Sequence, residues 1–217
     1  MSSSAYSVRI ALNVKGLEYE YKAVNLFRQE QHRPEYLKIN PIGFVPSLKD
    51  GNFVLADSFA IIMEDRFLTS YCFFCIMQYL EEKYPQHPLL PHDLKKKAIN
   101  YQAASIVTSS MQPLIRLPIL GYIGRNLGQD EKISWVNKHL GKGFAALEIL
   151  LRDHAGKYAT GDEIFLADVF LEPIINASQR YDFDMSEYPL MSRLSMAYQQ
   201  VPAIQAAMPE NQPDAPQ

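Results

Sequence analysis

The sequence predicts a two-part protein, with a mixed α/β part first and an all-helical part second. Short strand and helix signals alternate over residues 1–86, and three closely spaced prolines between positions 85 and 91 then interrupt the chain. From residue 92 to 208 apolar residues recur at helical spacing. We therefore expect domains at 1–86 and 92–208, followed by a polar, proline-rich tail at 209–217 that we expect to be disordered.

The composition is typical of a soluble globular protein. A length of 217 residues with 47% hydrophobic content is enough for a substantial core. The net charge of −3 gives no general attraction to nucleic acid or to anionic lipid, so we expect neither as a partner. The N-terminal segment MSSSAYSVRIALNVKG lacks the pattern of a secretory signal, and no apolar run is long enough for a membrane span. We expect cytoplasmic residence.

The first expected elements are a helix, a strand and a second, short helix. Apolar residues have helical spacing over residues 7–15, and Gly16 follows where glycine commonly ends a helix. Residues 19–26 have the composition of a strand. A short helix is expected over residues 34–39, because proline is well accommodated in the first turn of a helix.

A hairpin follows, and its features suggest a peptide-binding segment. Val45-Pro46 precedes an apolar alternating run, a position that is compatible with a cis bond and that would leave the backbone of Val45 free to pair with an extended peptide. Residues 47–49 and 53–55 flank Asp50-Gly51-Asn52, which is strong hairpin chemistry because glycine accepts a positive φ.

The helix expected after the hairpin begins with a polar pair. Asp57-Ser58 precedes the apolar run FAII, and this helix should end before Pro85. A hydroxyl and free backbone N–H groups at a helix start bind a carboxylate, while Asp57 can bind an ammonium group. The ligand that this segment implies has a peptide backbone and an amino-acid head group.

The two cysteines of the chain, Cys72 and Cys75, have the C-x-x-C spacing of redox and metal sites. They lie in YCFFCIM, an aromatic run with helical character, whereas a redox dithiol occupies a loop that leads from a strand into a helix. The five histidines are scattered, so no zinc site is expected. We interpret the pair as small apolar side chains, with an oxidoreductase as the least favoured alternative.

The second part is expected to be a helical bundle. Its main helical segments are 94–122, which Pro113 and Pro118 interrupt, and 131–154. Trp135 is most simply a packing residue of that bundle. A further helix is expected over 164–181, and Asp168 near its start should be structural because its charge meets the positive end of the helix dipole.

Four segments in order, SVRIAL, NPIGFVPSLKDG, DSFAII and TGDEIFLAD, give the chain a resemblance to the zeta-class glutathione transferases, a family that includes maleylacetoacetate isomerases, and above all to plant members. The resemblance implies a thioredoxin-like α/β domain, an all-helical domain, a homodimer and glutathione as cofactor. It also implies the cis–trans isomerisation of maleylacetoacetate to fumarylacetoacetate in tyrosine and phenylalanine catabolism, with glutathione transferase activity beside it.

The resemblance also implies the site residues. Ser2 and Ser3 correspond to the family's catalytic serines, which stabilise the thiolate of glutathione at the start of a helix. Arg180 matches the arginine that binds substrate carboxylate, and Arg116 is a second candidate in a turn where the sequence departs from the family. The implied glutathione contacts are Ser4, which replaces the cysteine of the motif, Gln31, Val45, Pro46, Asp57, Ser58 and Gln112.

Two departures from the family favour an alternative function. The chain begins directly before the serine pair, without the family's first strand, and residues 64–78 (EDRFLTSYCFFCIMQ) look like an insert, since joining Met63 to Tyr79 restores the family's helix. Our hypothesis is that a retained piece of intron encodes residues 64–78, and sequencing of the messenger RNA would test this. Loss of a central strand would leave backbone groups unpaired. A catalytically impaired isoform or a purely binding protein is therefore the alternative to the enzyme.

Overall fold

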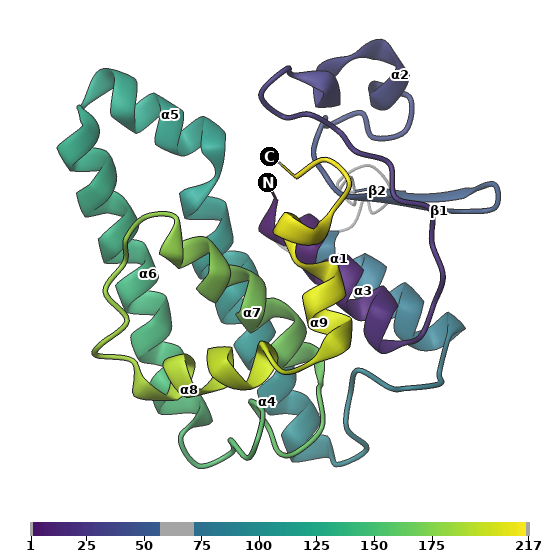
Figure 1. Ribbon diagram of the computed structural model, residues 1–217, viewed down its shortest axis with the longest axis vertical. Helices are drawn as coiled ribbons and strands as arrows, with labels where there is room; N and C mark the ends of the chain where they lie inside the picture. The colour runs from purple at the N-terminus through teal and green to yellow at the C-terminus, as the bar shows by residue number, and fades with distance from the viewer. Residues whose placement is uncertain (1, 57–71, 216–217) are drawn as a thin grey trace, which may run out of the picture. The chain divides into compact units, whose positions relative to one another are not determined.

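The computed structural model describes residues 2–56 and 72–215, and it divides the chain into two compact units (Figure 1). The first unit comprises Met1–Pro88 and Pro202–Gln217, and the second comprises Leu89–Val201. The boundary at Pro88 lies in the predicted proline-rich linker. The chain returns to the first unit for its last residues, which the sequence does not predict.

Helix α1 (Ser3–Val14) begins before the start predicted at residue 7, and residues from Tyr6 to Leu12 are buried. Its buried face includes Tyr6 and Ile10, at 1% and 0% exposure. Gly16, with φ of +68°, ends the helix as predicted. Helix α9 (Pro202–Ala207) lies beside α1 in Figure 1, and the Arg9 Nε donates to the Ala207 carbonyl at 2.9 Å.

The strand predicted over residues 19–26 is wrong. The described sheet has two strands, which pair only with each other, and residues 19–25 have no regular structure. A strand needs a neighbour for its N–H and C=O groups, and none of the described strands lies beside this segment. A side-chain contact holds it instead, because the Tyr21 hydroxyl donates to Asp214 Oδ1 at 2.9 Å.

The tail also differs from its prediction of disorder. Within residues 209–215 the chain forms the short 3₁₀ helix η5 (Pro209–Asn211), and the side chain of Gln212 donates to the carbonyls of Ala206 and Met208 at 2.9 and 2.8 Å. Composition alone favours disorder for such a segment, but contacts with α9 and Tyr21 order it.

The hairpin is as predicted. Strands β1 (Ser47–Asp50) and β2 (Phe53–Ala56) are antiparallel, and Gly51 has the positive φ of +59° that its turn requires. The Val45-Pro46 bond is cis. Before the hairpin come a 3₁₀ turn, η1 (Glu30–His32), and the predicted short helix, α2 (Pro34–Leu37).

Helix α3 (Cys72–Lys83) places both cysteines in a helix and ends before Pro85, as predicted. Residues 72–78 of the predicted insert therefore form part of this helix. The start predicted for this helix, residue 58, lies outside the described residues. So do the predicted glutathione contacts Asp57 and Ser58 and residues 64–71 of the predicted insert. Both α1 and β2 contact α3, so this helix connects the hairpin to the core of the first unit.

The second unit is all-helical, as predicted. The helix expected over 94–122 is interrupted in the middle, where a π-helical turn (η3) and a 3₁₀ turn (η4) replace regular α-helix. Within residues 2–56 and 72–215, every helix is too short or too polar to cross a lipid bilayer. The elements are α4 (Leu94–Ser105), η3 (Ile106–Met111), η4 (Gln112–Ile115), α5 (Leu117–Asn126), α6 (Gln129–Leu151), α7 (Leu166–Gln179) and α8 (Pro189–Tyr198).

Asp168 is the polar centre of this unit and is structural, as predicted. Its carboxylate is fully buried and accepts hydrogen bonds from the N–H groups of Ala159 and Phe165 at 2.8 and 2.9 Å and from the Tyr198 hydroxyl at 2.6 Å. Burial raises the pKa of Asp168 to about 6, against the opposite effect of these hydrogen bonds. The carboxylate links the start of α7 to α8.

Candidate functional site

The start of α1 has the features of an anion site. Ser2 is its N-cap, and the Ser2 Oγ accepts a hydrogen bond from the Ala5 N–H at 3.3 Å. The first turn contains no acidic residue, so no carboxylate of α1 itself offsets the positive end of the helix dipole. Ser3 and Ser4 follow in that turn, and both are half-buried. Hydroxyl donors and helix N–H groups together stabilise an anion such as a thiolate.

Gln31, in η1, offers an unpaired acceptor. Its side chain is 9% exposed, and no donor among the described residues lies within hydrogen-bonding distance of Oε1. Its Nε2 makes one long contact, to Gln29 Oε1 at 3.5 Å. A buried carbonyl oxygen without a partner costs free energy, and a ligand N–H would relieve this cost.

The loop before β1 is held by side chains that the sequence analysis did not single out. Asn40 is fully buried, and its Nδ2 donates to the Phe44 carbonyl at 2.7 Å, while its Oδ1 accepts from the Ile42 N–H at 3.2 Å. The Tyr36 hydroxyl donates to the same Phe44 carbonyl at 2.7 Å. These contacts fix the residue directly before Val45. The dipeptide Asn40-Pro41 is the sequence signal that could have predicted this turn.

Gly43 brings three of the predicted contacts together. It has φ of +70°, and a Cβ there would lie 3.0 Å from the Gln31 carbonyl oxygen and 2.6 Å from His32 Nδ1. Only glycine permits this close approach without a shift of the neighbouring atoms. The turn therefore lies against η1, so that Gln31 is near the loop that carries Val45 and Pro46, both of which are half-buried.

The second unit carries three predicted residues, Gln112, Arg116 and Arg180. Gln112 begins η4 and is 6% exposed, and Arg116, which is exposed, follows η4 as the N-cap of α5. One short turn thus brings these two residues together. Arg180 is exposed at the C-terminal end of α7, and its guanidinium forms no ion pair with any residue in the described ranges.

The two units offer different binding groups. The first unit offers a hydroxyl-capped helix start, a buried amide acceptor and a fixed loop before an exposed hairpin, which suit a thiol-containing peptide. The second offers two guanidinium groups, which suit carboxylates. The described part of the chain holds no group of three or more His, Cys, Asp or Glu side chains that could bind a metal ion.

Comparison with known proteins supports this chemistry. Residues 1–63 match the family model of the glutathione S-transferase N-terminal domain, and the match ends directly before the predicted insert. A zeta-class glutathione S-transferase from Euphorbia esula is 57% identical over 215 residues, which cover 99% of this chain and 89% of the relative. A probable maleylacetoacetate isomerase from Vibrio cholerae is 39% identical over 221 residues, covering 99% of this chain and 94% of the relative.

Solved structures extend the similarity to the fold. A bacterial maleyl pyruvate isomerase of the zeta class has a TM-score of 0.87 at 32% identity, with 99% of this chain and 96% of that chain covered. The maleylacetoacetate isomerase from Anaeromyxobacter dehalogenans, solved with glutathione in its active site, has a TM-score of 0.83 at 34% identity, with 99% and 94% covered.

Proposed function

The chain belongs to the zeta class of the glutathione S-transferase family, with that family's fold, and we propose that it catalyses the glutathione-dependent isomerisation of maleylacetoacetate to fumarylacetoacetate. The observation that carries the proposal is the start of α1, where a serine hydroxyl caps a helix that has no acidic residue in its first turn. This helix lies within the residues that match the family's N-terminal domain.

The described residues fit glutathione. Gln31 Oε1, which is buried and unpaired, would accept an N–H of the tripeptide, and the backbone of Val45 would pair with its extended part. Pro46, which follows Val45, and Ser4, which follows Ser3, stay predicted contacts. Asp57 and Ser58, for the γ-glutamyl head, and Gln112 in the second unit also stay predicted contacts. Bound glutathione supplies a thiolate that adds reversibly to a conjugated double bond, about which rotation then becomes easy.

Ser2 and Ser3 would keep that sulfur ionised. A free thiol has a pKa of about 8.5, so it is mostly protonated at neutral pH. The hydroxyl of Ser2 is held at the helix start by its contact with the Ala5 N–H, and a hydroxyl that donates to sulfur stabilises the charged form. The positive end of the α1 dipole, with no acidic residue in the first turn, adds to this effect.

Arg180 and Arg116 would bind the substrate. Maleylacetoacetate is a diacid, and a planar guanidinium can hold a carboxylate through two parallel hydrogen bonds. Both side chains are exposed, so a substrate carboxylate can reach them from solvent. Their role would be to orient the diacid.

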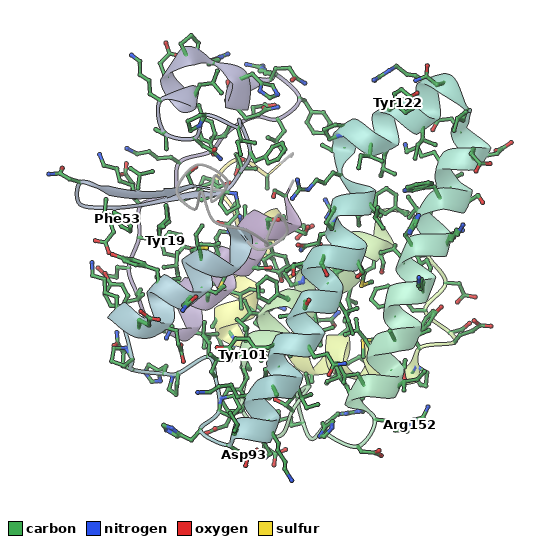
Figure 2. The ribbon with its side chains drawn as sticks, turned by 180° about the vertical axis from the view of Figure 1, so that it is seen from behind. Tyr19, Phe53, Asp93, Tyr101, Tyr122 and Arg152 are labelled. Atoms are coloured by element: carbon green, nitrogen blue, oxygen red, sulfur yellow. The ribbon has the colours of Figure 1, made fainter. Side chains whose placement is uncertain are left out.

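A cytoplasmic homodimer is part of the proposal. Both units expose large apolar side chains, among them Phe53 in the first unit and Tyr101 and Tyr122 in the second, at 50%, 37% and 62% exposure (Figure 2). A second subunit that covers such side chains would remove their apolar surface from water. A content of only two cysteines in 217 residues suits a reducing compartment, where proteins do not depend on disulfides. Sedimentation of the purified chain would measure its mass.

The experiment that tests the function combines binding with turnover. Purified protein is passed over immobilised glutathione and then assayed for isomerisation with and without free glutathione. We expect retention and glutathione-dependent turnover. Retention without turnover would leave a binding protein, and failure of both would overturn the proposal.

Gln31→Leu tests the binding residue. Leucine has a similar volume but no acceptor, so the KM for glutathione should rise about tenfold, while kcat at saturating glutathione stays the same. Stability should not fall, because the unpaired buried oxygen is removed. Gln78→Leu, at an exposed position of α3, is the matched control. An unchanged KM for glutathione in Gln31→Leu would exclude Gln31 from the site.

A further inference from the structure

The chain between α4 and α5 is irregular at the place where the second unit presents Gln112 and Arg116. Regular α-helix ends at Ser105, the π-helical turn η3 ends at Met111, and the 3₁₀ turn η4 ends at Ile115. In Figure 2 the segment can be followed from Asp93 through α4 and past Tyr101 to Tyr122 on α5. Such turns have poorer hydrogen bonding than α-helix, so their position needs support from a neighbour.

The first support is Gly143 on α6. A Cβ at this position would overlap the Met111 side chain and would lie only 2.7 Å from its Cε. Met111 is fully buried and so cannot swing out into solvent. Gly143 thus leaves the space in which Met111 packs. Met111 is the last residue of η3 and directly precedes Gln112.

The second support is Trp135, two helical turns earlier on α6. Its indole Nε1–H donates to the Leu114 carbonyl, within η4, at 2.9 Å. His139 packs against this indole with ring centroids 4.4 Å apart. Burial, helped by the charges of Lys138 and Lys142, lowers the pKa of His139.

These three residues form one surface of α6. Trp135, His139 and Gly143 are each four positions apart, a spacing that places them on the same face of a helix. Gly143 contacts the residue before Gln112, and Trp135 binds the carbonyl two residues after it. Gln112 is therefore held from both sides by a helix that carries none of the predicted site residues.

We propose that Gly143 and Trp135 are positioning residues for ligand binding, because together they fix the turn that presents Gln112 and Arg116. The inference rests on the proposed function, in which this turn contacts glutathione and the diacid. Neither residue touches the ligand. Their effect is on the affinity with which a correctly placed turn binds it, and not on the chemical step.

Gly143→Ala is the first test. The added methyl group displaces Met111 and, with it, Gln112, so the Kd for glutathione measured by calorimetry and the KM should both rise about tenfold, the equivalent of one hydrogen bond. The change in kcat should be under twofold. Met111→Ala in the same chain gives the methyl group room, and the double variant should restore the Kd to within about threefold of wild type.

Gly121→Ala on α5 is the matched control. A Cβ there would meet only the guanidinium of Arg125, which can move, so the substitution changes helix propensity in the same way without displacing the turn. We expect its Kd for glutathione to equal that of wild type. An equal loss of affinity in Gly121→Ala and Gly143→Ala would overturn the proposal.

Trp135→Phe is a second test of the positioning role, which applies even if Gly143→Ala does not fold. It retains an aromatic ring beside His139 but loses the donor to Leu114, and the Kd for glutathione should rise about threefold to tenfold. A spectroscopic readout is independent of activity: Trp135 is the sole tryptophan, so its fluorescence reports on the turn and should shift in Gly143→Ala without ligand.

The outcomes separate the two proposals. A wild-type chain that does not bind glutathione refutes the proposed function, whereas the fluorescence of Gly143→Ala still tests whether α6 holds the turn. A wild-type chain that binds and turns over, beside folded Gly143→Ala and Trp135→Phe variants with unchanged Kd values, refutes the positioning role and leaves the function intact.

Discussion

Ser2 combines a structural and a chemical role in one hydroxyl group. As an acceptor it caps α1 through the Ala5 N–H, and as a donor it would stabilise the sulfur of glutathione. The two roles use different parts of the hydroxyl, since a lone pair accepts and the proton donates. They can therefore be separated by substitution.

Ser2→Ala should lose both the helix cap and the donor to the glutathione sulfur, whereas Ser2→Asn should lose only the donor. Alanine removes the cap, so the free energy of unfolding should fall by about 1 kcal/mol, while asparagine is as good an N-cap as serine. Both variants lack the hydroxyl, so kcat should fall about tenfold or more in each. Denaturant unfolding and isomerase assays measure the two effects. Wild-type kcat in both variants would assign the thiol-activating role to Ser3 alone.

Asp168 illustrates a residue whose sequence position indicated its role. Asp168→Ala leaves the N–H groups of Ala159 and Phe165 and the hydroxyl of Tyr198 without their buried acceptor, so the free energy of unfolding should fall by about 3 kcal/mol or more. Chemical denaturation measures the loss. A variant that loses activity but no stability would contradict the structural role.

At the scale of elements, a carboxylate on the hairpin joins β1 to α3. Asp50 Oδ2 accepts hydrogen bonds from Lys83, Tyr79 and Tyr84, the last two at 2.8 and 3.0 Å. The Lys83 ammonium and the two hydroxyls hold the pKa of Asp50 below its usual value. Because the folded pKa is lowered, this stabilisation is present above the ordinary pKa of about 4 and is lost as pH falls through the folded value.

Asp50→Asn should therefore be less stable than wild type at pH 7, and the difference between the two should shrink below pH 4, where the wild-type carboxyl is also neutral. Thermal unfolding midpoints of both proteins from pH 7 to pH 3 test this. Asp50 is at the surface, so the difference at pH 7 should be small but should decrease with added salt. A difference that is constant with pH would mean that the charge of Asp50 has no role.

Elements whose contacts are local were predictable. The hairpin depends on Gly51 and its flanking alternation, and the predictions for the helices and for the Val45-Pro46 bond likewise used neighbouring residues. Residues 19–26 have strand composition but no neighbouring strand, and composition alone does not include the partner that a strand needs. The same reason explains the ordered tail, whose partners are Tyr21 and α9.

The whole molecule is a chain that crosses between its units twice. It leaves the first unit at Pro88 and returns at Pro202, so the last residues belong to the core of the first. Ile204 and Ala207 of α9 are fully buried, and Asn13 and Arg9 of α1 donate to backbone carbonyls of α9. The first unit is therefore complete only when the second has been synthesised.

A chain that ends at Val201 tests this dependence. It lacks α9 and η5, so α1 loses its buried neighbour and the partner of Arg9, and residues 1–88 should become sensitive to protease while residues 89–201 stay resistant. Limited proteolysis with mass analysis of the fragments measures both units at once. Equal resistance of the first unit in the full and shortened chains would show that α9 contributes little.

The sequence by itself determined the two-part fold class, the hairpin, the helical second part and the family, because each depends on residues close together in the chain or on ordered motifs. It also indicated Ser2, Gln31 and Gln112 as site residues, through the resemblance. The tertiary structure decided how they are supported: Gly43 against Gln31, Gly143 and Trp135 around Gln112, and α9 against α1. These contacts join residues far apart in sequence, and only packing determines which of them meet.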